Sequence, residues 1–425
     1  MLQTLRNAWR IEEIRKKILF TLLIVLLYRI GNAIPVPFVN TALLQQYFAY
    51  LQNTALGLLD AMSGGSFSNA TIFALSIQPY INASIIIQLL CIAIPALERM
   101  SKEEGEEGRK KIASITRYST VAIGLLQGFG YYMLMKNNGI IVAEASQSVW
   151  AAIIIILTFT SGSALIMWLG EQITEFGVGN GISIILFASI ISRFPNSVIT
   201  SIQNVINGSL SWWAAVLVFL GALALIVLIV FVNDAERRIP VQYAKRVVGR
   251  KMYGGQSTHL PMKVNMSGVM PIIFASSISS IPATIAAFTG HSESAWAKTN
   301  TIPYAIIYLL LIIFFAYFYS TIQFNPIEVA NNLKKNGGYI PGFRPGKPTS
   351  EFIQRVLNKI TLFGAIYLGI IAVTPILVSH FSNAAALTGL SLGGTSIIIV
   401  VGVALETVRA IEAQMLMRNY KGFLS

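Results

Sequence analysis

Side chains that commonly carry out covalent chemistry are scarce in this chain of 425 residues. It has three histidines, one cysteine (Cys91) and only two aspartates, Asp60 and Asp234. Asp60 lies in an outer segment and Asp234 at a cytosolic helix end, so they do not form an intramembrane protease pair. The sequence also contains neither an H-E-x-x-H zinc motif nor a P-loop. We therefore expect no catalytic site, no metal and no cofactor, and a function that depends on non-covalent contacts.

The composition indicates a membrane protein. Hydrophobic residues make up 54% of the chain, charged residues make up 12%, and the mean hydropathy is +0.65. A soluble domain usually carries about a quarter charged residues, and a helix needs about 20 residues to cross the hydrocarbon. Ten apolar runs approach that length: 18–35, 71–95, 112–135, 150–169, 182–204, 212–232, 266–289, 302–323, 360–381 and 392–411. We predict an all-α polytopic fold with ten transmembrane helices.

Positive charge is divided unevenly among the gaps between these runs. Of the 31 Lys and Arg residues, 27 lie in the N-terminal segment, in alternate gaps or near the C-terminus. Segments rich in Lys and Arg remain on the cytoplasmic side of a membrane. Both termini are therefore predicted to be cytoplasmic, and the basic segments are expected to contact anionic lipid headgroups.

The ten runs divide into five and five around residue 206, which gives an N-terminal half (1–205) and a C-terminal half (206–425). Because five is odd, the second half would run antiparallel to the first, as in an inverted repeat. A small-solute secondary transporter would share this arrangement, and we keep it as the alternative. Such a transporter should offer convergent polar groups at the midplane, where these runs are apolar.

The gap between the first two runs indicates a segment that returns into the protein. Residues 54–62 form a short apolar half-helix pattern, and residues 63–70 are rich in Ser and Gly. The second stretch is too polar for a helix that faces lipid. We expect it to fold back into the bundle, with a plain surface loop as the alternative.

Two basic gaps, 233–265 and 324–358, carry more charge than orientation requires. In the first gap, apolar and polar residues alternate on both sides of Gly254-Gly255, which predicts a β-hairpin that stands off the membrane. In the second gap, residues 336–350 include four glycines and three prolines, which favours a rigid exposed tip. Lipid binding alone would not require shaped loops, so we expect these loops to bind partners.

Five stretches carry a more specific signal than composition does. They are FALSIQPYINASIIIQLL (73–90), GNGISI (179–184), QSTHLPMKVN (256–265), the segment 325–346 and GGTS (393–396). In content and in order these stretches resemble the SecY family, whose members form the central channel subunit of the bacterial Sec protein translocase. The resemblance extends from one end of the chain to the other.

This resemblance implies an hourglass channel, built from two inverted halves, that passes unfolded polypeptides across the cell membrane of a bacterium or sideways into it. A ring of aliphatic side chains would close the waist of the channel. The positions matched by motif are Ile81, Ile85, Ile182, Leu186, Ile273 and Ile399. An apolar ring excludes water and ions when empty, yet it binds no passing side chain tightly.

The resemblance also implies a plug beneath the ring, at residues 58–70. Its members include Asp60, Ser63, Gly64, Gly65, Ser66 and Phe67. We expect its small residues to pack closely and to leave readily, because little apolar surface would anchor them.

A lateral gate, through which signal sequences would reach lipid, is expected between spans two and three and spans seven and eight. Polarity alone suggests four gate residues: Gln88, Gln127, Ser277 and Ser280. Hydrogen bonds between helices of one half are the alternative role of these side chains.

The resemblance further implies that the basic loops dock the ribosome, whose phosphates attract cations, and the motor ATPase SecA. The docking residues would be Arg237, Arg238, Lys245, Arg246, Arg250, Lys251, Lys334, Lys335, Arg344 and Lys347, with Arg344 favoured for the motor. The subunits SecE and SecG, unfolded secretory polypeptides and their signal sequences are the other expected partners. The chain itself would be a passive channel, and an insertase or scaffold without a pore is a further alternative.

Overall fold

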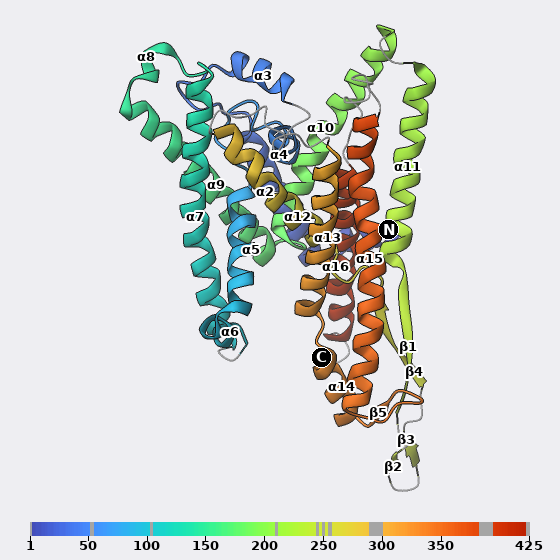
Figure 1. The fold of residues 1–425 in the computed structure, drawn as a ribbon. Coiled ribbons are helices and arrows are strands. Elements are labelled where there is room, and N and C mark those ends of the chain that lie inside the picture. Colours follow the sequence, from blue (N-terminus) through green and yellow to red (C-terminus); the bar gives the residue numbers. More distant parts are fainter. Residues whose placement is uncertain are drawn as a thin grey trace.

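The computed structural model describes residues 2–51, 55–102, 105–208, 211–243, 246–248, 251–253, 257–288, 301–381 and 394–421. These residues form a bundle of helices, and a narrow β-hairpin extends beyond the helix ends (Figure 1). The elements before residue 207 are α1 Leu2–Arg10, α2 Glu12–Gly31, α3 Thr41–Tyr50, α4 Ala55–Ser63, α5 Gln78–Ala93, α6 Pro95–Lys102, α7 Gly105–Asn137, α8 Ala143–Ser146, α9 Val149–Phe176 and α10 Gly181–Ile206.

The rest of the chain contains both helices and the strands. Its elements are α11 Trp212–Asp234, β1 Glu236–Tyr243, β2 Arg246–Val248, β3 Lys251–Tyr253, β4 Ser257–Lys263, α12 Met270–Phe288, α13 Ile302–Gln323, α14 Pro326–Lys335, β5 Gly338–Tyr339, α15 Lys347–Phe381 and α16 Gly394–Lys421.

Each predicted span contains one helix, in the order α2, α5, α7, α9, α10, α11, α12, α13, α15 and α16. Among the described residues, five helices are long and apolar enough to cross a membrane by length and composition: α9, α10, α11, α13 and α15. The apolar helices α5 and α12 are shorter. The prediction of a helical, multi-pass membrane fold is confirmed, whereas the number of ten spans stays a prediction.

The second span begins later than predicted, because residues 71–77 are not helical. This segment instead pairs with the chain that follows α2. The N–H of Ile72 donates to the carbonyl of Ile34 (3.0 Å), and the N–H of Val36 donates to the carbonyl of Ala70 (2.9 Å). Irregular backbone is tolerated at membrane depth only where protein covers it and satisfies its polar groups. These contacts meet that condition, and hydropathy alone could not reveal them.

Several helices extend past the predicted ends of their apolar runs. Helix α15 begins at Lys347 rather than at 360, α7 begins at Gly105 rather than at 112, and α16 continues to Lys421 rather than ending at 411. Charge limits how much of a helix enters the hydrocarbon, but it does not end the helix. Much of the second basic gap is therefore helical.

The predicted hairpin is present, and it joins the two basic gaps. Strand β1 lies between β4 and β5, with antiparallel registers that include Ile239↔Leu260 and Gln242↔Tyr339. Val248 of β2 pairs with Lys251 of β3 in a separate two-stranded sheet. The glycine pair, Gly254-Gly255, lies outside the described residues.

The alternation along β1 gives the sheet an apolar face. Ile239 and Val241 are buried, and they share a cluster with Met262 of β4 and with Ile353 and Leu357 of α15. The opposite face of β1 is polar and exposed. The hairpin is therefore fixed to the bundle through α15, and this packing orients the charged residues that it carries.

Gly162 of α9 provides a test of this packing. A Cβ at this position would lie 2.0 Å from the carbonyl oxygen of Ile72, so only glycine allows α9 to approach the segment between α4 and α5. We expect Gly162→Ala to lower the Tm of the purified protein in detergent, because overpacking costs about 1–3 kcal/mol.

The matched control is Gly221→Ala on α11, where a Cβ meets nothing within 4 Å. This change should leave the Tm unchanged or raise it, because alanine favours a helix over glycine. Equal Tm values for both variants would contradict the packing described for α9.

Candidate functional site

The helix starts position the six predicted ring residues. At the start of α10, the side chain of Asn180 accepts hydrogen bonds from the N–H groups of Ile182 (3.0 Å) and Ser183 (3.4 Å). Gly181 lies so close to α9 that a Cβ would be 1.9 Å from the carbonyl oxygen of Gly170. This fixed start places Ile182 and Leu186 one turn apart on α10.

The ring residues lie in one hydrophobic cluster. Ile81, Ile85, Leu186, Ile273 and Ile399 are buried members, and the most exposed of them, Ile81, is 3% exposed. Ile182 is half-buried and packs against the same cluster. The six residues come from α5, α10, α12 and α16, which belong to both predicted halves.

The plug helix α4 contributes a side chain to this cluster. Met62 is buried in the same cluster as the ring residues. Helix α4 also lies toward the end of the bundle opposite the hairpin (Figure 1). An apolar constriction with a short helix against it can exclude water and ions.

Asp60 anchors the plug segment to α10. Its Oδ2 accepts a hydrogen bond from Arg193 Nη2 at 2.7 Å, and its Oδ1 accepts one from the N–H of Ser68 at 2.7 Å. Asp60 is buried, with 5% of its surface exposed, whereas the side chain of Arg193 reaches the surface. A buried carboxylate needs such partners to remain charged. Arg193 was not among the predicted site residues, because its position in an apolar run gave no sign of a partner in α4.

The glycine pair of the plug segment makes a close approach to α10. Gly64 and Gly65 have φ angles of 72° and 86°, in the region that favours glycine. A Cβ on Gly64 would lie 2.8 Å from the carbonyl oxygen of Ser189. The hydroxyls of Ser63 and Ser66 donate to backbone carbonyls within the segment, at 3.0 Å and 2.9 Å. The small residues therefore pack closely, as predicted.

The expectation that little apolar surface anchors the plug is wrong. Phe67 is buried, its ring stacks on that of Tyr131 with centroids 4.1 Å apart, and the Tyr131 hydroxyl donates to the Phe67 carbonyl. Leu56 and Ala70 are buried in the same cluster. Full burial of one such aromatic ring stabilises by about 1.5–3 kcal/mol. The sequence contained Phe67, but it did not indicate the aromatic pocket built by α3, α7 and α9.

The four predicted gate residues have different environments. Gln88 donates to Ser84 of its own helix (3.1 Å), and Gln127 is half-buried on α7. The hydroxyl of Ser280 donates to the carbonyl of Ser277, also within one helix (2.7 Å). Only the hydroxyl of Ser277 reaches the other half, where it donates to Gln78 Oε1 of α5 at 3.3 Å.

Gln78 was not predicted as a site residue. It is buried at the start of α5, and its Nε2 donates to Met62 Sδ of the plug helix at 3.7 Å. A polar side chain directly before Pro79 in an apolar run was the available signal. Polarity alone does not identify its partners.

Four of the predicted docking residues lie on or next to the three-stranded sheet. Arg237 and Arg238 lie on β1, Lys334 and Lys335 end α14, and all four are exposed. Strand β5, which follows α14, pairs with β1 and so brings the two basic gaps together. Arg246 and Lys251 lie on β2 and β3, whereas Lys245 and Arg250 lie outside the described residues.

The tip that carries Arg344 and Lys347 is held in place. The carbonyl of Arg344 accepts a hydrogen bond from Thr349 Oγ1 (2.8 Å), and Phe343 stacks on Phe352 with centroids 4.2 Å apart. Both basic side chains are exposed. This arrangement presents cations on a rigid surface, where they can bind phosphate or carboxylate groups.

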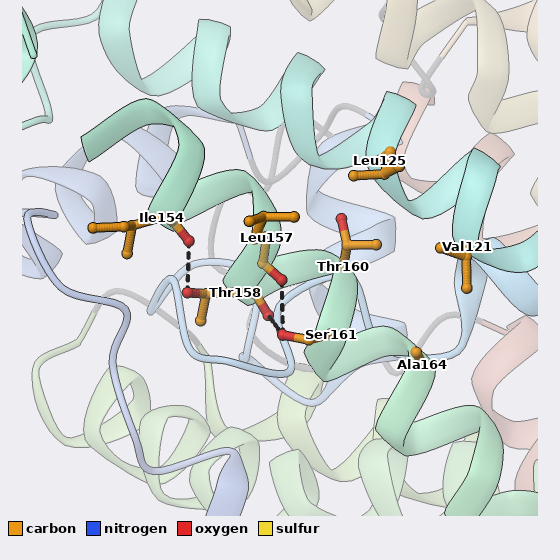
Figure 2. A pocket seen from close by; sticks show the side chains of 8 residues that line it. All are labelled: Val121, Leu125, Ile154, Leu157, Thr158, Thr160, Ser161 and Ala164. Carbon is orange, nitrogen blue, oxygen red and sulfur yellow. Dashed lines mark hydrogen bonds between the residues drawn. The ribbon is translucent and has the colours of Figure 1, made fainter. Parts of the chain in front are cut away.

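A groove of about 490 Å³ lies between α7 and α9, and none of the ring residues lines it (Figure 2). Its lining residues are Val121, Leu125, Ile154, Leu157, Thr158, Thr160, Ser161 and Ala164. Figure 2 shows that two hydroxyls donate hydrogen bonds to carbonyls of their own helix. Thr158 Oγ1 donates to the carbonyl of Ile154 at 2.6 Å, and Ser161 Oγ donates to the carbonyl of Leu157 at 2.7 Å. These hydroxyls are therefore already satisfied, and the groove lacks the convergent polar groups of a small-solute site.

The chain is similar to known proteins along its whole length. A family model described as SecY matches residues 71–408. The protein translocase subunits SecY of Streptomyces galbus and Streptomyces scabiei are 46% and 45% identical to it, over 100% of each chain.

Solved structures share the fold at low sequence identity. "The structure of a protein conducting channel" has a TM-score of 0.66 at 17% identity and covers 95% of this chain and 93% of that one. "Sec61 in the Canine ribosome-channel complex from the endoplasmic reticulum" has a TM-score of 0.63 at 17% identity, with the same coverage. A structure described as showing that "The plug domain of the SecY protein stablizes the closed state of the translocation channel and maintains a membrane seal" has a TM-score of 0.63 at 16% identity and covers 95% and 92%.

The Asp60–Arg193 ion pair can be tested against the pair formed by the other aspartate. Asp60→Asn removes the charge from a buried carboxylate. We expect it to lower the free energy of unfolding by about 2 kcal/mol and to speed hydrogen exchange at the Ser68 amide. Asp234, which pairs with Arg409, is 58% exposed at its side chain.

Asp234→Asn is the matched control, because an exposed pair contributes about 0–1 kcal/mol. Hydrogen exchange, measured by mass spectrometry on both variants, compares the effect of losing the buried pair with the effect of losing the exposed pair. Unchanged exchange around Ser68 in the Asp60→Asn variant would show that the ion pair does not hold the plug segment.

Proposed function

Because the chain belongs to the SecY family, we propose that it is a protein-conducting channel, which passes unfolded polypeptides across a membrane and releases membrane-spanning segments sideways into lipid. The observation that carries this proposal is that the six aliphatic residues, from four helices of both halves, belong to or pack against one hydrophobic cluster, which also contains Met62 of the plug helix. A passage for a polypeptide must be closed to ions at rest. Apolar side chains close it without binding the substrate.

The ring is proposed as the seal, and the plug segment is proposed to hold it closed. Five of the ring residues are buried among other apolar side chains: Ile81, Ile85, Leu186, Ile273 and Ile399. The plug segment has a charged anchor at Asp60 and an aromatic anchor at Phe67 (see above). An extended chain that enters from the hairpin side would separate the ring residues and displace α4.

The lateral gate is proposed to lie where α5 and α7 face α12 and α13. The hydrogen bond between Gln78 and Ser277 supports this position, because it joins α5 of the N-terminal half to α12 of the C-terminal half. Signal sequences and membrane-spanning segments would leave between these helices. The division into inverted halves at residue 206 belongs to the same proposal, and it agrees with the end of α10 at Ile206.

The channel is proposed to be passive. The few Asp, His and Cys side chains of the sequence form no recognisable catalytic set, so directional movement must be driven from outside the chain. We propose that SecA or a translating ribosome supplies this drive on the face that carries the hairpin and Arg344. A structure with the same fold comes from a ribosome-channel complex, which supports the ribosome as a partner.

The family also supports a proposal for the remaining partners and the location. We propose SecE and SecG as further subunits and the cell membrane of a bacterium as the location, with both termini in the cytoplasm. The charge distribution supports this orientation, because 27 of the 31 cations lie in segments assigned to the cytoplasmic side. The same segments would contact anionic lipids.

The sealing role of the ring can be tested with paired substitutions on α5 and α10. Ile81→Ser together with Leu186→Ser should increase ion conductance through the resting protein in planar bilayers by about tenfold or more, because hydroxyls allow water to enter an apolar constriction. The control is Ile86→Ser with Ile191→Ser on the same helices, since both isoleucines are more than 40% exposed on the bundle surface.

The control pair should leave the conductance unchanged. If the ring variant conducts no more than the control while both incorporate equally into the bilayer, these residues do not seal a pore.

A further inference from the structure

One buried amide contacts both the plug helix and the opposite side of the lateral gate. Gln78 accepts a hydrogen bond from the hydroxyl of Ser277 on α12 (3.3 Å) and donates one to Met62 Sδ on α4 (3.7 Å). All three residues are buried: Gln78 is 8% exposed, Ser277 is 0% exposed and Met62 is 5% exposed. A single side chain therefore joins three elements that the proposed mechanism requires to move.

The surroundings make each of these contacts costly to break alone. Ile77, the residue before Gln78, is buried in the apolar cluster that contains Met62 and the ring residues. A buried amide without a partner costs free energy, because no water replaces the lost hydrogen bond. Its two ends also belong to one planar group, so a rotation that gives Oε1 a new partner moves Nε2 away from Met62.

Other polar groups nearby do not join the elements in this way. The hydroxyl of Ser276, next to Ser277 on α12 and also buried, donates to the carbonyl of Ile273 within the same helix (2.8 Å). Ser280 likewise bonds within α12. Among the hydrogen bonds described for α12, only the one from Ser277 crosses to α5.

We propose that Gln78 is a positioning residue that couples the lateral gate to the plug. When α12 moves away from α5, Oε1 of Gln78 loses Ser277, the amide turns toward a new partner, and the contact with Met62 breaks. Opening the gate then releases the plug helix, and displacing the plug helix favours gate opening, because coupling between two sites is reciprocal. This inference rests on the proposed channel function.

The experiment measures gate and plug separately in the full-length protein. The plug is followed by resting ion leak from proteoliposomes. The gate is followed by the distance between spin labels at Ile92→Cys on α5 and Ile281→Cys on α12, in a background with Cys91→Ser. Both labelled positions are exposed in the structure.

Changes on one element should alter the readout of the other. Ser277→Ala on the gate helix should raise the ion leak by about threefold to tenfold. Met62→Leu keeps an apolar side chain of similar size on the plug helix. It should increase the population of molecules with a long distance between the two spin labels, also by about threefold to tenfold. Gln78→Leu should raise the ion leak and also increase the population with the long distance between the labels. Adding Ser277→Ala to Gln78→Leu should then give no further change, because both remove one contact.

The control is Ser276→Ala, which removes a buried hydroxyl that bonds only within α12 and should alter neither readout. The coupling is overturned if Ser277→Ala leaves the leak unchanged and Met62→Leu leaves the distance unchanged, or if the effects of Gln78→Leu and Ser277→Ala add. The ring variant with Ile81→Ser and Leu186→Ser separates this failure from failure of the channel. If that variant leaks and Gln78→Leu does not, the channel stands without the coupling; if neither leaks, the proposed function fails with it.

Discussion

The mutual packing of aliphatic side chains from four helices is the interaction on which the rest of the structure depends. A passage wide enough for a polypeptide would also admit ions, unless its walls meet when it is empty. Ile81, Leu186, Ile273 and Ile399 come from α5, α10, α12 and α16, and they belong to one buried cluster. Dispersion and the exclusion of water stabilise this contact without direction, so a passing side chain of any type can replace it temporarily.

Polar contacts supply the specificity that the apolar cluster lacks. The plug segment is fixed by the Asp60–Arg193 pair and by the hydroxyl of Tyr131 on the carbonyl of Phe67. Such contacts are directional, so they select one arrangement of α4 among many that would satisfy an apolar surface. Gln78 adds a contact that depends on the position of α12. The proposed mechanism thus combines a non-specific seal with a specific means of holding it closed.

Features with a strong local pattern could be predicted from the sequence. Apolar runs located the helices, the alternation around Ile239 and Val241 predicted a strand, and family motifs identified the residues that share the apolar cluster. Features that depend on distant partners could not be predicted. The irregular segment 71–77 is apolar and so resembled helix, and its pairing with the chain after α2 appears only in three dimensions. The aromatic pocket of Phe67 and the contacts of Gln78 are hidden from sequence for the same reason.

The central claim is that a translocating polypeptide passes between the residues of the apolar cluster. The most direct measurement is disulfide cross-linking of a secretory chain, arrested during translocation and carrying one cysteine, to channel variants that lack Cys91. We predict cross-links to Ile81→Cys and Ile273→Cys, and none to Ile86→Cys, which lies on the exposed face of α5. Cross-links to Ile86→Cys without cross-links to the two cluster positions would contradict the account.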